Sequence, residues 1–105
     1  MNDRPLAKIV VDGQEYFWSM KKDHHGFGRH IHFTAYSATH HSSPFRAVLN
    51  HLDEREIREE TLFSPRLAAA LIRQAGAEGW DPLLPHKPVT IESGKELLMK
   101  ALESF

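Results

Sequence analysis

The chain has 105 residues, the usual size of one domain, and its hydrophobic fraction of 41% suits a folded core rather than disorder. It contains 0 cysteines, which excludes disulfide frameworks, thiol catalysis and cysteine-held zinc or iron–sulfur sites. The formal net charge of −1 provides no overall attraction to nucleic acid or anionic lipid, and no apolar run reaches the length of a signal peptide or a membrane span. These features predict a cytoplasmic protein without membrane contact.

The first half of the chain predicts a series of β-strands. Residues 8–11 and 15–20 are two β-favouring runs, and Asp12-Gly13 between them suits the positive φ angles of a tight hairpin turn. The elements that follow are predicted, in chain order, as a loop at 23–28, a strand at 29–37, a polar loop at 38–44 and a strand at 45–51.

Alternation of side chains along these strands predicts one shared apolar face. An antiparallel meander aligns the following apolar residues from its four runs: Ile9 and Val11; Tyr16, Trp18 and Met20; Ile31, Phe33 and Ala35; Phe45, Ala47 and Leu49. A slip of one residue in any pairing would break this face, so the register is constrained.

The second half of the chain predicts two helices. Ser64 is suited to an N-cap, Pro65 to the first helical position, and apolar residues then recur at helical spacing as far as Gly76 or Gly79. Residues 93–104 form a second apolar stripe behind a capping-box pattern. The remaining segments are predicted as an exposed loop or short helix at 53–60 and a short extended segment at 88–91.

Together these elements predict an α+β fold with a single domain over residues 1–105. It is a two-layer sandwich in which an antiparallel four-stranded meander (6–52) packs on two C-terminal helices (64–79 and 93–104). The segment 88–91 would add a fifth strand at the edge of the sheet. Trp80, beyond the first of these helices, is predicted to anchor the helix end against the core.

Two short motifs suggest chemistry but lack the parts that it needs. Gly26-Phe27-Gly28 is followed by a strand and has neither the third glycine of a dinucleotide fingerprint nor the Gly-Lys-Ser/Thr of a P-loop. The serines beside His40 and His41 have no recognisable orienting acid or oxyanion hole. No catalytic residue and no cofactor are therefore assigned, and a non-enzymatic role is favoured.

Eight histidines are the unusual count in the composition. His30 and His32 are two apart in one predicted strand, a spacing at which two imidazoles can hold one metal ion. No third ligand is predicted beside them, although Asp23 in the preceding loop could reach. A metal site at His30 and His32 is disfavoured relative to two solvated side chains.

The outward face of the predicted sheet combines aromatic, histidine and cationic side chains. Its candidate binding residues are Phe17, Lys21, His30, His32, Tyr36 and Arg46. Small sheets with such faces stack bases or dock partners. Scattered exposed aromatic side chains are also ordinary on protein surfaces, so the face is a hypothesis rather than an assignment.

A set of short motifs resembles small bacterial proteins of unknown function. The motifs are Val11-Asp12-Gly13 followed by Tyr16-Phe17-Trp18, then Phe63-Ser64-Pro65, then Gly79-Trp80-Asp81-Pro82. The resemblance implies a bacterial source and carries no activity and no catalytic residue with it.

The sequence leaves three functions open. The leading hypothesis is a non-enzymatic interaction or accessory domain that binds a protein partner or a second copy of itself through the outward sheet face. The first alternative is a metal-binding protein or metal-dependent enzyme that uses His30 and His32. The second is a module for single-stranded nucleic acid, which the near-neutral net charge disfavours.

Overall fold

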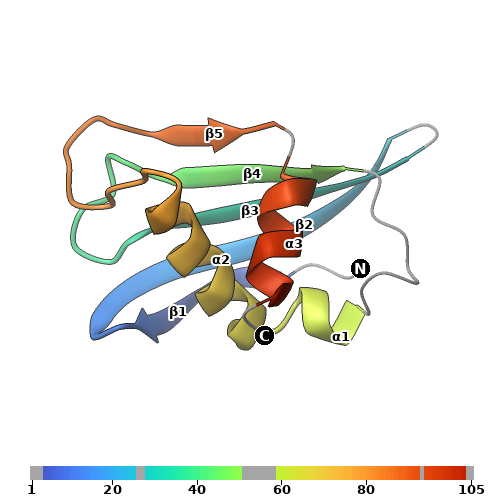
Figure 1. Ribbon diagram of the computed structural model, residues 1–105, viewed down its shortest axis with the longest axis horizontal. Coiled ribbons are helices and arrows are strands. Elements are labelled where there is room, and N and C mark those ends of the chain that lie inside the picture. The colour runs from blue at the N-terminus through green and yellow to red at the C-terminus, as the bar shows by residue number, and fades with distance from the viewer. Residues whose placement is uncertain (1–3, 26–27, 51–58, 93, 104–105) are drawn as a thin grey trace.

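The sheet has five strands in the order β1-β2-β3-β4-β5 (Figure 1). The computed structural model describes residues 4–25, 28–50, 59–92 and 94–103. The strands are β1 (Arg4–Val11), β2 (Gln14–His25), β3 (Gly28–Ser37), β4 (Phe45–Asn50) and β5 (Val89–Ile91). The first four form an antiparallel meander, and β5 lies parallel to β4 at one edge. The predicted meander and its fifth edge strand are both confirmed.

The register of the meander is the one that the apolar alternation predicts. Met20 lies opposite Phe33, which in turn lies opposite Ala47. Ile31 likewise lies opposite Leu49, and all five side chains are buried. Directly opposed residues share a face of a sheet, so these pairs create one continuous apolar face, called here the inner face.

The predicted loop at 23–28 is wrong. Strand β2 continues to His25 and β3 begins at Gly28, so that Asp23 lies opposite His30 and His25 lies opposite Gly28. A hydrogen-bonded ladder can continue beyond the last apolar residue because it is made by the backbone. The polar side chains of this segment give no alternation signal. The sequence pattern therefore predicts both strands to be shorter at this end than they are.

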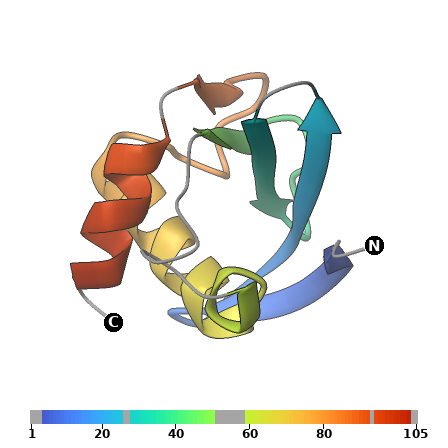
Figure 2. The same ribbon diagram turned by 90° about the vertical axis from the view of Figure 1, so that its right-hand side faces the viewer.

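Three helices accompany the sheet: α1 (Glu59–Leu62), α2 (Pro65–Ala77) and α3 (Lys95–Glu103). Figure 2 shows α2 and α3 on one side of the curved sheet, where they cover the inner face. Their buried residues join those of the strands in one core. The predicted two-layer α+β sandwich is confirmed. The last predicted residue of the second helix, at 104, and most of the charged segment 53–60 lie outside the described residues.

The ends of α2 follow the predicted capping chemistry. The Ser64 hydroxyl accepts a hydrogen bond from the Leu67 N–H at 3.2 Å, and Pro65 occupies the first helical position. At the other end Gly79 has a φ of 107°, and the Trp80 N–H reaches back to the Ala75 carbonyl at 3.0 Å. This is the arrangement that ends helices through a left-handed glycine.

Trp80 anchors this helix end to the strands, as predicted. Its side chain is buried, and its indole N–H donates to the carbonyl of Ser43 at 2.9 Å. The buried Ser43 hydroxyl donates to the Leu84 carbonyl and accepts from the Lys87 N–H at 2.9 Å. The loop before β4 and the loop before β5 are thereby joined at one end of the sheet.

The start of α3 lies unusually close to β4. The Gly94 N–H donates to the Val48 carbonyl at 2.8 Å. A Cβ placed on Gly94 would come within 2.7 Å of a Leu49 side-chain carbon and 2.8 Å of the Val48 oxygen. Glycine is required here because only hydrogen fits between the helix and the strand. The predicted cap at Ser93 lies outside the described residues.

Candidate functional site

The surface of the sheet turned away from α2 and α3 is the candidate site (Figure 2). None of the described helices covers it. We call it the outer sheet face and define it by its described strand residues: Lys8, Val10, Glu15, Phe17, Ser19, Lys21, His32, Thr34, Tyr36, Arg46, Val48 and Thr90.

Three rows of opposed residues span three or more strands of this face, and Val10 and Glu15 form a shorter fourth row. The three longer rows are Lys8–Phe17–Tyr36, Ser19–Thr34–Arg46–Thr90 and Lys21–His32–Val48. The first row is aromatic, the second is small and polar with one cation, and the third is mixed and basic. Each of these three rows contains one cation, and the two aromatic side chains lie in the first row.

An aromatic cluster forms the end of the face nearest the β3–β4 loop. Phe17 and Tyr36 lie 5.7 Å apart between ring centroids. His41, from the loop, places its ring 5.0 Å from Tyr36 and 6.3 Å from Phe17, in both cases edge-on. Such tilted and edge-to-face contacts between rings are favourable.

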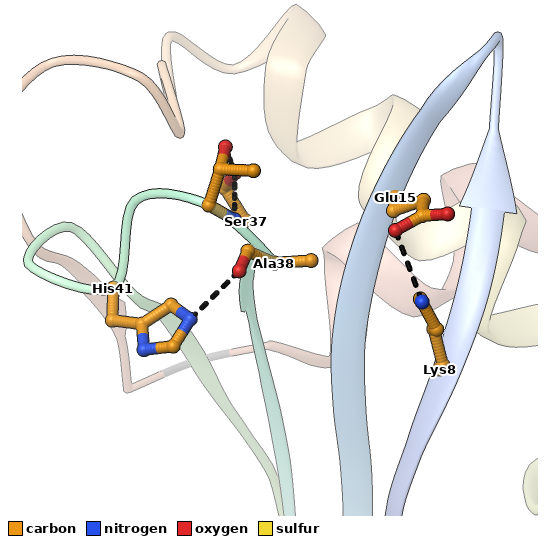
Figure 3. Close-up of polar contacts among 6 residues, drawn as sticks. Lys8, Glu15, Ser37, Ala38 and His41 are labelled. Atoms are coloured by element: carbon orange, nitrogen blue, oxygen red, sulfur yellow. Dashed lines mark hydrogen bonds and ion pairs between the residues drawn. The ribbon is translucent and has the colours of Figure 1, made fainter.

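A hydrogen bond that its ring donates to the loop backbone fixes His41 in this cluster (Figure 3). Its Nε2 atom lies 2.9 Å from the carbonyl oxygen of Ala38. A carbonyl only accepts hydrogen bonds, so Nε2 carries the proton in this arrangement. The ring is thus oriented by a backbone acceptor on one side and by two aromatic rings on the other.

Positive charge predominates among the ionised side chains of the outer sheet face. Lys8 forms an ion pair with Glu15 across the β1–β2 hairpin at 3.1 Å (Figure 3). Lys21 and Arg46 are exposed and have no ion pair within the described ranges. Among the described side chains of this face, Lys8, Lys21 and Arg46 carry positive charge and Glu15 is the single acid. The chain's overall charge of −1 conceals this local excess.

The structure brings five of the six predicted binding residues together. Phe17, Lys21, His32, Tyr36 and Arg46 all lie on the outer sheet face. Phe17 and Tyr36 are half-buried by their mutual contact rather than fully exposed. The side chain of the sixth residue, His30, lies outside the described part of the chain.

The predicted metal pair gains no ligand set from the described residues. His32 has Lys21 and Val48 as its neighbours in the row, and neither side chain suits a hard or borderline cation. Among the side chains that the structure describes, no group of three or more histidine, aspartate or glutamate residues could hold a metal ion. Asp23, expected in a loop, lies in β2 directly opposite His30.

A second candidate feature is an open hollow of about 380 Å³ between the tip of the β1–β2 hairpin and α2. Tyr16 and Ile72 line it, and Arg73 pairs with Asp12 at 3.3 Å on its rim. Burial raises the pKa of the Tyr16 hydroxyl, and the carboxylates of Asp12 and Asp81 raise it further.

His41 is the member of the site that sequence reasoning missed. The sequence predicts a polar loop at this position, and hydropathy alone cannot tell that the loop folds back over the sheet. The signal that could have found it is weak: two aromatic residues opposed across neighbouring strands leave a surface that a nearby ring can cover.

Comparisons with models of protein families, with curated proteins and with solved structures found no match to the chain. The resemblance to small bacterial proteins therefore stays a prediction from short motifs. Within the described segments, no helix has both the length and the apolar character needed to cross a membrane.

Proposed function

We propose that this chain is a non-enzymatic binding domain that docks an acidic segment of a protein partner on the outer sheet face. One observation carries the proposal. Lys21 and Arg46, which form no ion pair with the described residues, share the open side of a two-layer fold with half-buried Phe17 and Tyr36. Such a surface offers apolar contact area together with two cations that attract carboxylates.

The arrangement of the aromatic rings favours a protein partner over single-stranded nucleic acid. Proteins that bind single strands stack successive bases on aromatic side chains spaced along the path of the backbone. Here Phe17 and Tyr36 are opposed in one row, and His41 packs edge-on against both. The other rows contain no phenylalanine, tyrosine or tryptophan that could stack a second base.

Charge also argues against a second copy docked face to face. Two outer sheet faces placed against each other would bring like charges together, since three of the four ionised side chains described there are cations. A partner of opposite sign has no such cost. The proposal therefore commits to an acidic segment with interspersed apolar residues.

The test is a titration of the isotope-labelled chain with a synthetic peptide of alternating glutamate and leucine, followed by NMR. We expect amide shifts at Phe17, Lys21, Tyr36 and Arg46 that saturate and that weaken as salt is added. The double variant Lys21→Glu with Arg46→Glu should bind about tenfold or more weakly, because attraction is replaced by repulsion.

A matched control changes one charge on the helical side. Arg66 is exposed in the first turn of α2, where an acid is favoured by the helix dipole, and Arg66→Glu, once circular dichroism has shown it to be folded, should bind as the parent does. Equal loss in both variants would show that overall charge, not this face, controls binding. Binding of oligothymidylate in preference to the peptide would replace the proposal with a nucleic-acid function.

A further inference from the structure

The two edges of the sheet differ greatly in length. Strand β5 has 3 residues, whereas β1 has 8 and no described strand lies beyond it. Among the described residues, the two most exposed large hydrophobic side chains are Val10 at 61% and Leu6 at 53%, and both belong to β1. A long edge strand with exposed apolar side chains is a template for pairing with another strand.

The register of the hairpin identifies which backbone groups of β1 are free. Val11 and Gln14 flank a two-residue turn in which Asp12 and Gly13 have φ angles of 51° and 83°. The pair that flanks such a turn is hydrogen-bonded, and bonded pairs then alternate with non-bonded ones along the ladder. The N–H and C=O groups of Lys8 and Val10 therefore point away from β2, toward the free edge.

An independent hydrogen bond supports this alternation. Glu15 lies opposite Val10, and its carbonyl accepts from the Ala38 N–H at 3.0 Å, on the side of β2 turned away from β1. This is the direction expected if Val10 and Glu15 form a non-bonded pair. Lys8 and Val10 thus present two donors and two acceptors to a neighbouring strand.

We propose that β1 pairs antiparallel with β1 of a second copy, about a two-fold axis at Ile9. Lys8 of each copy then lies opposite Val10 of the other, and these pairs use the free donors and acceptors of both strands. Ile9 lies opposite its counterpart on the inner face, and Ala7 lies opposite Val11. The paired segment, 7–11, is the part of β1 that is in regular register with β2.

The side chains of this segment are complementary to their own two-fold copies. Ala7 and Ile9 are half-buried at the edge of the core, and a neighbouring strand would complete their burial. The aliphatic stem of Lys8 would cover Val10 of the other copy while its ammonium stays with Glu15, 3.1 Å away. An axis at Lys8 would instead oppose two lysines, which is destabilising, and would extend into the register shift between Arg4 and Ala7.

The interface is small. Five residues on each side cover far less than the roughly 1,200 Å² that stable complexes bury, so the pairing should be weak and depend on concentration. It leaves Lys21 and Arg46 exposed, and it does not rest on the proposed docking function. The two proposals can therefore fail separately.

Cysteine substitution tests both the pairing and its register. The chain has 0 cysteines, so each introduced thiol is unique. With the axis at Ile9, the two position-9 Cα atoms lie roughly 4.5 Å apart, which a disulfide spans, and the two position-8 Cα atoms lie roughly 9 Å apart, which it does not. In a glutathione redox buffer we expect a cross-linked dimer from Ile9→Cys and little from Lys8→Cys, although the side chain at position 8 is more exposed.

Cross-linking of Lys8→Cys in place of Ile9→Cys would overturn the axis at Ile9. Absence of cross-linking in both variants, with each shown by circular dichroism to be folded, would overturn the pairing. Amide hydrogen exchange tests the same pairing without an introduced thiol. The Lys8 and Val10 N–H groups should exchange about tenfold more slowly at millimolar than at micromolar protein.

Val10→Pro supplies the matched control for amide exchange. The Val10 N–H points to the free edge, so proline there removes a donor to the second copy without removing a hydrogen bond to β2. The variant should fold and lose the concentration dependence at Lys8. In the parent chain, the Lys8 and Val10 amides could instead be protected only when the acidic peptide is added, whatever the protein concentration. That result would identify a foreign strand as the occupant of the edge and refute pairing with a second copy.

Discussion

Gly94→Ala is expected to destabilise the fold through one added methyl group. The new Cβ would lie 2.7 Å from Leu49 Cδ2, 2.8 Å from the Val48 oxygen and 3.3 Å from Ala47 Cβ. The first of these atoms belongs to a fully buried side chain and the second to the backbone of β4, so neither can move without disturbing the core. The start of α3 must then move away from the strand.

Three contributions determine how much Gly94→Ala changes the free energy of unfolding. Overpacking of a close contact costs about 1–3 kcal/mol, and loss of the hydrogen bond from Gly94 to Val48 costs about 1 kcal/mol more. The lower entropy of the unfolded chain returns about 0.4–1 kcal/mol. The net expectation is a free energy of unfolding reduced by about 2 kcal/mol.

Urea unfolding followed by fluorescence of buried Trp18 and Trp80 measures this loss. For a domain of this size the midpoint should fall by about 1–2 M. Gly76→Ala makes the same chemical change inside α2, where the added Cβ has no atom within 4 Å, and should stabilise the fold by about 0.5–1 kcal/mol. If both variants shift in the same direction, the close approach at Gly94 is not the cause.

Three further substitutions test the loop contacts and the raised pKa of Tyr16. Ser43→Ala removes a buried hydroxyl that bonds across two loops and should cost about 1–3 kcal/mol in urea unfolding, whereas Ser42→Ala, at an exposed hydroxyl, should cost less than about 1 kcal/mol. Tyr16→Phe tests alkaline stability: because the folded state raises the Tyr16 pKa, its protonated form stabilises the parent below the ordinary tyrosine pKa of about 10, and this is lost as the pH rises further. The unfolding free energy of the variant relative to the parent should therefore be constant below about pH 9 and increase above pH 10, and a constant difference throughout would contradict the pKa argument.

Most of the fold follows from local patterns in the sequence. The apolar alternation of β1 to β4 specifies their register, since any slip would expose one strand's buried side chains. Ser64 and Pro65 specify the start of α2, and Gly79 lies in the left-handed conformation beyond its end. These signals are local, and each agrees with the arrangement that buries the apolar core.

What the sequence did not predict depends on contacts between distant segments. The hydroxyl of Ser43 is buried because the loop before β5 folds over it. Gly94 is required because the start of α3 touches β4. His41 joins Phe17 and Tyr36 only after the β3–β4 loop turns back over the sheet. The candidate site was predicted where alternation determines it, and missed where a loop contributes.

The position of the helices after the meander in the chain has a consequence for the order of assembly. Each of the first four strands pairs with its neighbour in sequence, so the meander can form by successive local closures. The residues that cover its inner face come later: α2 follows β4, and both β5 and α3 follow α2. While a ribosome is still synthesising the helices, the emerging meander exposes Trp18, Phe33 and Leu49 to the cell. We therefore expect slower translation through the second half of the chain to lengthen the time for which this apolar surface stays uncovered.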